Sequence, residues 1–158
     1  MSNLSSDLVS RHGIEPDWRF GSTFKVRWSE VDGFGHVSHR SHIGWCEEAR
    51  NAYFAALGEK AFRIDRAGPV LKEIGFTYER SLEPESEVVV TVRVAWLRNT
   101  SFRMEFAAWS NGLVGRGHAI CIWMLNSTGE RVTLPEALRD AMMHEDNTED
   151  IRERAVGA

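Results

Sequence analysis

Apolar and polar residues alternate with a period of two along most of the second half of the chain. Residues 87–97 are rich in β-branched side chains, residues 102–110 alternate, and residues 113–125 form a third apolar run. All three are predicted strands. Residues 98–101 predict a turn, and the Asn-Gly pair at 111–112 predicts a hairpin.

Two further strands are predicted earlier in the chain. Residues 22–30 place Phe24, Val26 and Trp28 on one side and polar residues on the other, as in a half-buried strand. Residues 69–82 predict a strand with a bend near Gly75.

A helical period replaces the alternation between residues 38 and 57. Its apolar positions are Ile43, Cys46, Ala49, Tyr53, Ala56 and Leu57, and Gly58 is the predicted stop. The helix is rich in small residues, which predicts a close approach to a flat neighbour such as a sheet. A shorter helix is predicted over 134–143, with Pro135 at its start.

The order of these elements predicts an α+β fold. Consecutive strands joined by tight turns favour an antiparallel sheet, with the long helix packed against it. The 158 residues suit one domain. We expect an N-terminal arm over residues 1–19, the domain over 20–143, and a charged, flexible tail over 144–158.

Composition and charge narrow the classes of partner. With 42% hydrophobic residues and a net charge of −4, the chain is typical of a soluble globular protein. The negative charge argues against nucleic acid or an anionic membrane as the partner. A signal peptide and a membrane span are not expected. Cys46 and Cys121 lack Cys-x-x-Cys spacing, so buried, reduced thiols in a cytoplasmic protein are expected.

Three of the six histidines fall in the segment EVDGFGHVSHRSH, residues 30–42. His39 and His42 could share a helix face, but His36 precedes the helix, and His118 is the obvious further candidate ligand. No metal site is therefore predicted. Cys46 lies on the apolar face of the helix without a histidine at i+3 or i+4, which favours packing over nucleophilic catalysis.

Asp32 offers a different chemistry. It follows a predicted strand and precedes a Gly-x-Gly bend, and Ser38 is a candidate N-cap for the helix. The free N–H groups of residues 39–41 would carry partial positive charge. A carboxylate beside such a helix end suits attack on a carbonyl group. On local grounds alone, an ordinary Asp-Gly turn is the favoured explanation of Asp32.

The segment VDGFGHVSHRSHIGWCEEARNAYF resembles the hotdog-fold acyl-CoA thioesterases of the 4-hydroxybenzoyl-CoA thioesterase type. Their signature is similar to D-x-x-G-H-V-N-N-x-x-Y-L-x-Y-F-E-E-A-R. The matching residues are Asp32, Gly35, His36, Val37, Glu47, Glu48, Ala49 and Arg50. The similarity extends over about residues 22–142, including Leu82–Pro84, Arg98–Phe102 and Leu134–Pro135.

The resemblance implies a hotdog fold, in which an antiparallel sheet wraps around one long helix and two subunits share the active site. It implies that Asp32 is the catalytic carboxylate, as nucleophile or as general base. A backbone N–H near His39 would polarise the thioester carbonyl. No cofactor or metal is implied.

The chain departs from the family signature where family members shape the acyl pocket or the dimer interface. Ser38 and His39 replace the common Asn-Asn, His42 replaces tyrosine, Trp45 fills the second aromatic position and Cys46 replaces phenylalanine. We expect His36, Ser38, His42 and Trp45 to contact substrate. His42 would line the pocket or tune the reaction, and an essential acid or base role is the third alternative.

The predicted function is hydrolysis of an acyl-CoA to a free acid and CoA, with Arg98 near the CoA phosphates. The alternative is a non-catalytic acyl-CoA-binding hotdog protein; the motif of hotdog dehydratases is absent. A homodimer or homotetramer is expected, because residues 87–97 are apolar on both faces and one helix covers only one of them. The sequence does not predict the identity of the acyl group.

Overall fold

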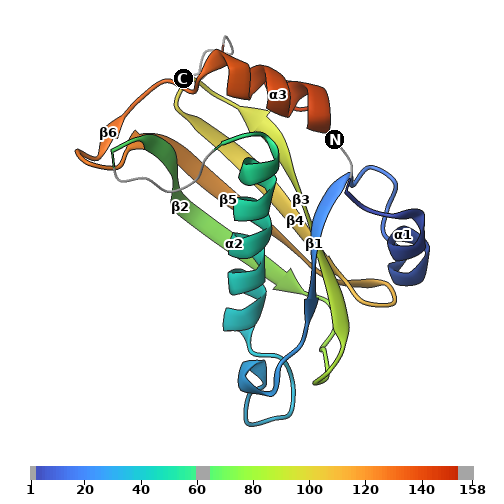
Figure 1. Ribbon diagram of the computed structural model, residues 1–158. Helices are drawn as coiled ribbons and strands as arrows, with labels where there is room; N and C mark the ends of the chain where they lie inside the picture. The colour runs from blue at the N-terminus through green and yellow to red at the C-terminus, as the bar shows by residue number, and fades with distance from the viewer. Residues whose placement is uncertain (1–2, 60–64, 153–158) are drawn as a thin grey trace, which may run out of the picture.

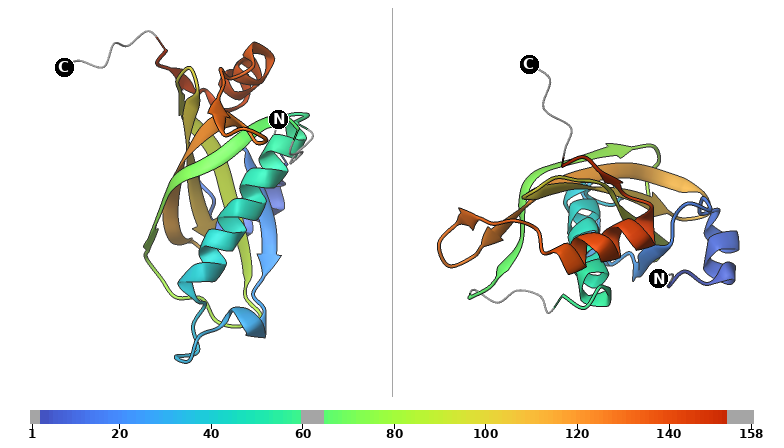
Figure 2. Two further views of the ribbon diagram at one scale, coloured as in Figure 1. Left: turned by 90° about the vertical axis from the view of Figure 1, so that its left-hand side faces the viewer. Right: turned by 90° about the horizontal axis from the view of Figure 1, so that it is seen from above.

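The computed structural model describes residues 3–59 and 65–152. One curved antiparallel sheet lies along the long helix α2 (His39–Ala56), as Figures 1 and 2 show. Helix α3 (Glu136–Asp146) lies at one end of the sheet, and the short helix α1 (Ser6–His12) lies beside β1. The predicted α+β hotdog architecture is confirmed.

The sheet has the strand order β1-β3-β4-β5-β2. Its strands are β1 (Phe20–Lys25), β2 (Ala67–Tyr78), β3 (Glu87–Leu97), β4 (Ser101–Trp109), β5 (Leu113–Leu125), and the short β6 (Glu130–Arg131) and β7 (Glu149–Asp150). The predicted hairpin is present, with φ of 52° at Asn111 and 107° at Gly112. β2 pairs with β5 and not with its neighbour in sequence, β3. Its irregularity lies between Leu71 and Glu73, not at Gly75.

The core lies between α2 and the inner face of the sheet. Alternate residues of β3, from Val88 to Val94, are at most 1% exposed and face this core. Ala49 is fully buried, so a small side chain does let the helix approach the sheet there. Ala55 and Ala56 are exposed. The prediction that the small residues face a flat neighbour therefore holds for only part of the helix.

The N-terminal segment covers part of the outer face of the sheet, the face away from α2. Ile14 and Trp18 pack there against Val89, Ala107 and Trp109. The sequence argument that one face of residues 87–97 lacks a cover is therefore wrong for this part of β3. The weak hydrophobic pattern of residues 1–19 does not predict these contacts, because they involve strands far along the chain.

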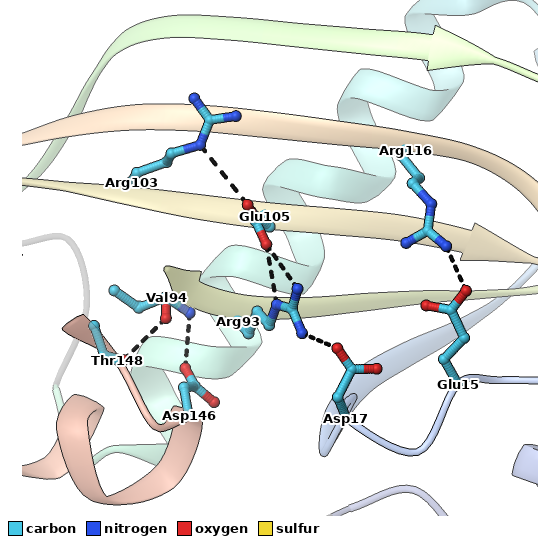
Figure 3. Close-up of polar contacts among 9 residues, drawn as sticks. All are labelled: Glu15, Asp17, Arg93, Val94, Arg103, Glu105, Arg116, Asp146 and Thr148. Atoms are coloured by element: carbon cyan, nitrogen blue, oxygen red, sulfur yellow. Dashed lines mark hydrogen bonds and ion pairs between the residues drawn. The ribbon is translucent and has the colours of Figure 1, made fainter. Parts of the chain in front are cut away.

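Ion pairs fasten the same N-terminal segment to the outer face. Arg93 pairs with both Asp17 and Glu105, and Arg116 lies 2.5 Å from Glu15 (Figure 3). The Arg93 guanidinium also lies 4.4 Å from the centre of the Trp18 ring, a cation–π contact. Residues predicted as an arm are thus part of the folded unit.

The first strand ends earlier than its alternation predicts. Strand β1 stops at Lys25, and Trp28 begins a 3₁₀ turn, η1 (Trp28–Glu30), where its side chain is 72% exposed. The carboxylate of Glu30 accepts the Arg27 N–H at 2.8 Å and closes this turn. The predicted strand over 22–30 is therefore wrong beyond Lys25, because a side chain captures the backbone donor.

The C-terminal residues join α3 to the free edge of β3. Asp146 Oδ2 accepts the Val94 N–H at 2.8 Å and the Tyr53 hydroxyl at 2.5 Å. Thr148 Oγ1 donates to the Val94 carbonyl at 2.9 Å, and β7 pairs in parallel with β3. Part of the predicted tail is thus built into α3 and β7, while residues 153–158 lie outside the described range. Across the described residues, no helix has the length and apolar character to cross a membrane.

Candidate active site

Asp32 sits at the base of a tight loop between η1 and α2. Val31 and Val37 form an isolated antiparallel bridge, and the Asp32 N–H donates to the His36 carbonyl at 2.8 Å. Gly35 has φ of 82°, a left-handed conformation that glycine adopts without strain. This glycine allows the chain to reverse and return to the start of the helix.

The two oxygens of the Asp32 carboxylate have different environments. Oδ1 accepts the N–H groups of Phe34 at 2.8 Å and His36 at 3.3 Å, as in an Asx turn. Oδ2 accepts no hydrogen bond from the residues that the structure describes, and Asp32 is exposed. The loop therefore orients the carboxylate and leaves one oxygen available for chemistry.

The start of α2 presents free backbone donors close to this loop. Ser38 is the N-cap residue, as predicted, but its side chain makes no capping hydrogen bond. Its N–H donates to the Glu30 carbonyl at 2.8 Å, and the Ser41 N–H donates to the Ser38 carbonyl at 3.0 Å. Only His39 and Arg40 keep N–H groups with no acceptor in the described part of the chain, so the prediction of three free donors is corrected to two.

Asp32 lines two neighbouring hollows. One, of about 400 Å³, is lined by Asp32, Val37, His39, His42, Tyr78, Glu79, Arg80 and Ser81. The other, of about 230 Å³, is lined by Ser29, Val31, Asp32, Ser38, Arg40 and Ser41. Asp32 thus lines both hollows, Ser38 lines only the smaller one, and His39 and His42 line only the larger one.

His42 is buried, with 3% of its surface exposed. Its Nδ1 lies 3.3 Å from the Ser38 carbonyl, and its Nε2 is buried without a hydrogen-bond partner. The rings of Trp45, Phe76 and Tyr78 lie 5.2–5.3 Å from the imidazole, centre to centre. Burial lowers the His42 pKa, which the bond to the Ser38 carbonyl partly opposes and the nearby His39 reinforces. Burial therefore favours the neutral imidazole.

His36 and Trp45, the other predicted substrate contacts near the loop, do not line the two hollows beside Asp32. His36 is exposed on the loop. Trp45 is buried, stacks on Phe24 at 5.9 Å and donates its indole N–H to Glu30 Oε1 at 3.0 Å. Trp45 thus contacts the base of the loop rather than the hollow beside Asp32.

Arg98 lies far from Asp32 within one chain. It follows the last residue of β3, whereas Glu87, the first, pairs with Lys25 just before η1. A strand of 11 residues spans roughly 35 Å. Arg98 instead lies over the Trp96 ring at 5.1 Å, and its carbonyl accepts from Arg139.

The two competing chemistries find no support in the site. Burial raises the pKa of the Cys46 thiol to about 12, against a smaller opposing effect of Arg50, so the reactive thiolate is disfavoured. Within the described residues, no group of three His, Cys, Asp or Glu side chains could hold a metal ion. His118 lies on the outer face with Glu73 at 3.1 Å.

Some residues around the site carried no sequence signal. Phe76 and Tyr78 come from β2, and only the packing of that strand beside α2 brings them to His42. Glu30 begins the histidine-rich segment of residues 30–42, but residue spacing does not predict its hydrogen bonds to α2.

Comparisons with known proteins agree with this geometry. Residues 26–142 match the family model of the thioesterase-like superfamily. A thioesterase superfamily protein from Jannaschia sp. CCS1 superposes with a TM-score of 0.82 at 32% identity, covering 92% of this chain and 94% of that one. A thioesterase from Thermus thermophilus, crystallised with coenzyme A and Zn, gives 0.75 at 25% identity, covering 84% and 98%.

More distant structures share the fold alone. The 1,4-dihydroxy-2-naphthoyl-CoA thioesterase Slr0204 of Synechocystis has a TM-score of 0.70 at 13% identity, over 78% of this chain and 94% of that one. No curated protein sequence matches the chain. Since the family model covers most of the sequence and the sheet-and-helix architecture agrees, this chain belongs to the thioesterase-like superfamily of hotdog proteins.

Proposed function

We propose that this protein hydrolyses an acyl-CoA thioester to a free acid and CoA, with Asp32 as the catalytic carboxylate. The observation that carries the proposal is the pairing of a free Asp32 oxygen with the unpaired N–H groups of His39 and Arg40. A thioester carbonyl placed between them would meet a nucleophile or base on one side and oxyanion donors on the other.

Two routes use these groups. As a general base, Asp32 takes a proton from water, and the resulting hydroxide attacks the carbonyl carbon. As a nucleophile, Asp32 forms a mixed anhydride that water then hydrolyses. In both routes the carbon–sulfur bond breaks and the CoA thiolate leaves and takes up a proton. Neither route uses a metal or an organic cofactor.

The 400 Å³ hollow suits the acyl side of the substrate. It adjoins the aromatic rings around His42, and the imidazole would add a hydrogen-bonding atom beside Tyr78, while Glu79, Arg80 and Ser81 make another part of the lining polar. Ser38 and His36, at the helix start and on the loop, lie where the thioester and the pantetheine arm would pass. The Thermus relative bound to coenzyme A supports CoA as the ligand.

The two edges of the sheet support a homodimer. At β1 the side-chain amide of Asn3 accepts the Gly21 N–H at 2.9 Å and donates to the Gly21 carbonyl at 2.8 Å, so it occupies that edge. Strand β2 pairs only with β5 among the described residues, and exposes Val70, Leu71 and Tyr78 by 39–47%. An unpaired edge with exposed apolar side chains favours pairing with a second copy, which could also bring a partner's Arg98 toward CoA. A homotetramer would need a second interface between such dimers.

Release of free thiol from a panel of acyl-CoAs tests the function directly. The panel should span short, long and aromatic acyl groups, because the sequence leaves the acyl group open. Binding of acyl-CoA with no thiol release by the wild-type protein would favour a non-catalytic binding protein instead.

The variant Asp32→Asn tests the assignment of the carboxylate. We expect turnover to fall by at least about 10²-fold, because the amide can neither attack nor take a proton. The fold should persist, since Asn still accepts the N–H groups of Phe34 and His36 at Oδ1. A variant that kept more than about a tenth of wild-type kcat would show that Asp32 is not the catalytic group.

A further inference from the structure

Glu30 ties the Asp32 loop to α2 through its backbone. Its carbonyl accepts the Ser38 N–H at 2.8 Å and the Ser41 hydroxyl at 3.3 Å. Both donors lie at the start of the helix, Ser38 as its N-cap and Ser41 in its first turn. The residue two positions before Asp32 is thus bonded to the same helix end that carries the free N–H groups.

The Glu30 carboxylate adds a second tie, deeper in the helix. Oε1 accepts the Trp45 indole N–H at 3.0 Å, and Oε2 accepts the Arg27 N–H at 2.8 Å. Trp45 is 3% exposed and stacked on Phe24, so it is a fixed anchor. The carboxylate therefore connects the turn before Asp32 to a point two turns along α2.

Apart from its internal hydrogen bonds, the Val31–Val37 bridge and the bond from the Val37 N–H to the Leu82 carbonyl, the loop has little else to fix it. Residues 33–36 are all exposed, and Phe34 at its tip is 89% exposed. Attack on a carbonyl depends on the position of the attacking oxygen, and an error of about 1 Å can cost about 10²-fold in rate. A group that sets the distance between Asp32 and the helix N-terminus would thus control turnover.

We propose that Glu30 is a positioning residue that holds Asp32 in register with the N-terminus of α2, through Trp45 and the first helical turn. This inference rests on the proposed function, since it concerns the same site. Glu30 acts through Asp32, so its removal should matter only while Asp32 carries out the reaction.

A double-mutant cycle tests this with steady-state thiol release from acyl-CoA. We expect Glu30→Ala to lower kcat by about 10- to 100-fold and to change KM much less. In an Asp32→Asn background it should cause no further loss, because groups that act as a unit are not additive. Glu30→Gln should recover part of kcat, since its amide oxygen can still accept from Trp45. The control is Glu48→Ala, which removes an exposed carboxylate on α2 that lines a third hollow together with Glu30 and Trp45; this variant should match the wild type.

Trp45→Phe provides a second approach if Glu30→Ala does not fold. It keeps the aromatic packing and removes the indole N–H. It should therefore lower kcat in the wild-type background and cause no further loss in the Asp32→Asn background. Losses that multiply in the Asp32→Asn background, or a rise in KM with kcat unchanged, would overturn the positioning role while leaving Asp32 as the catalytic group. A wild-type protein that cleaves no thioester would overturn the proposed function and this inference together.

Discussion

At the scale of single residues, His42 has the most distinctive environment near the site. Three aromatic rings surround its imidazole, and Nε2 lacks a partner among the described residues. Burial is the main cause of its lowered pKa. The imidazole therefore binds a proton more readily in the unfolded chain than in the folded one. As a result, the free energy of unfolding should decrease as the pH falls below about 6.5.

We therefore expect His42→Phe to weaken the acid sensitivity of folding. The contribution of His42 is fully favourable above about pH 6.5 and is lost as the pH falls toward the lowered folded-state pKa. Urea unfolding at about pH 7 and about pH 5 should show a smaller loss of stability for the variant than for the wild type. His144→Ala, at an exposed position in α3, is the control. Equal losses in His42→Phe and wild type would contradict the expectation.

The same variant bears on the reaction. His42 touches the pocket but lies beyond the carboxylate and the backbone donors that the mechanism needs, so His42→Phe should remain active. A kcat/KM–pH profile with a shifted limb would make His42 a tuning group, and an unchanged profile would make it a pocket wall.

At the scale of elements, one carboxylate helps to attach α3 to the rest of the fold. Asp146 accepts the Val94 N–H at a position of β3 that β1 does not reach, and it also accepts the Tyr53 hydroxyl of α2. Burial raises the Asp146 pKa against the opposing effect of these hydrogen bonds. One side chain thus joins a helix, the sheet and the central helix.

Asp146→Ala should destabilise the protein by roughly 2–4 kcal/mol, because it leaves two buried donors without an acceptor. Tyr53→Phe removes one of those donors and should cost only about 1 kcal/mol. Urea denaturation of both variants measures the difference. Turnover below the unfolding transition should stay near wild type, since this contact lies far along β3 from Asp32. Equal losses in the two variants would show that the Val94 bond contributes little.

At the scale of the whole molecule, the two edges of the sheet differ in whether other residues cover them. Asn3 occupies the β1 edge at Gly21, and the N-terminal segment covers nearby outer-face residues. The β2 edge stays unpaired within the described chain and exposes Val70 and Leu71 beside Lys72 and Glu73. Association through β2 is therefore the expected route to the dimer.

Light scattering at micromolar concentration should show an oligomer for the wild type. The double variant Val70→Lys and Leu71→Lys should shift it toward the monomer, because adjacent lysines on an edge strand oppose pairing. If the partner subunit completes the site, the double variant should also release thiol more slowly than the wild type. Trp28→Lys, a change to an exposed residue away from β2, is the control for added charge. A wild-type monomer with full activity would count against an interface site.

Local patterns in the sequence determined most of the elements. Alternation located β3, β4 and β5, the helical period located α2, and Asn111-Gly112 located a hairpin, because each depends on neighbours within a few residues. The spacing from Asp32 to Ser38 placed a carboxylate beside a helix start for the same reason. These properties follow from backbone sterics and short-range hydrogen bonds.

Tertiary contacts decided the rest. The pairing of β2 with β5, the aromatic rings around His42 and the cover over Val89 depend on residues distant in sequence. Even the end of β1 was decided by the Glu30 carboxylate, which closes η1 and reaches Trp45. No alternation or spacing records such contacts, because their free energy arises only when the separate segments pack together.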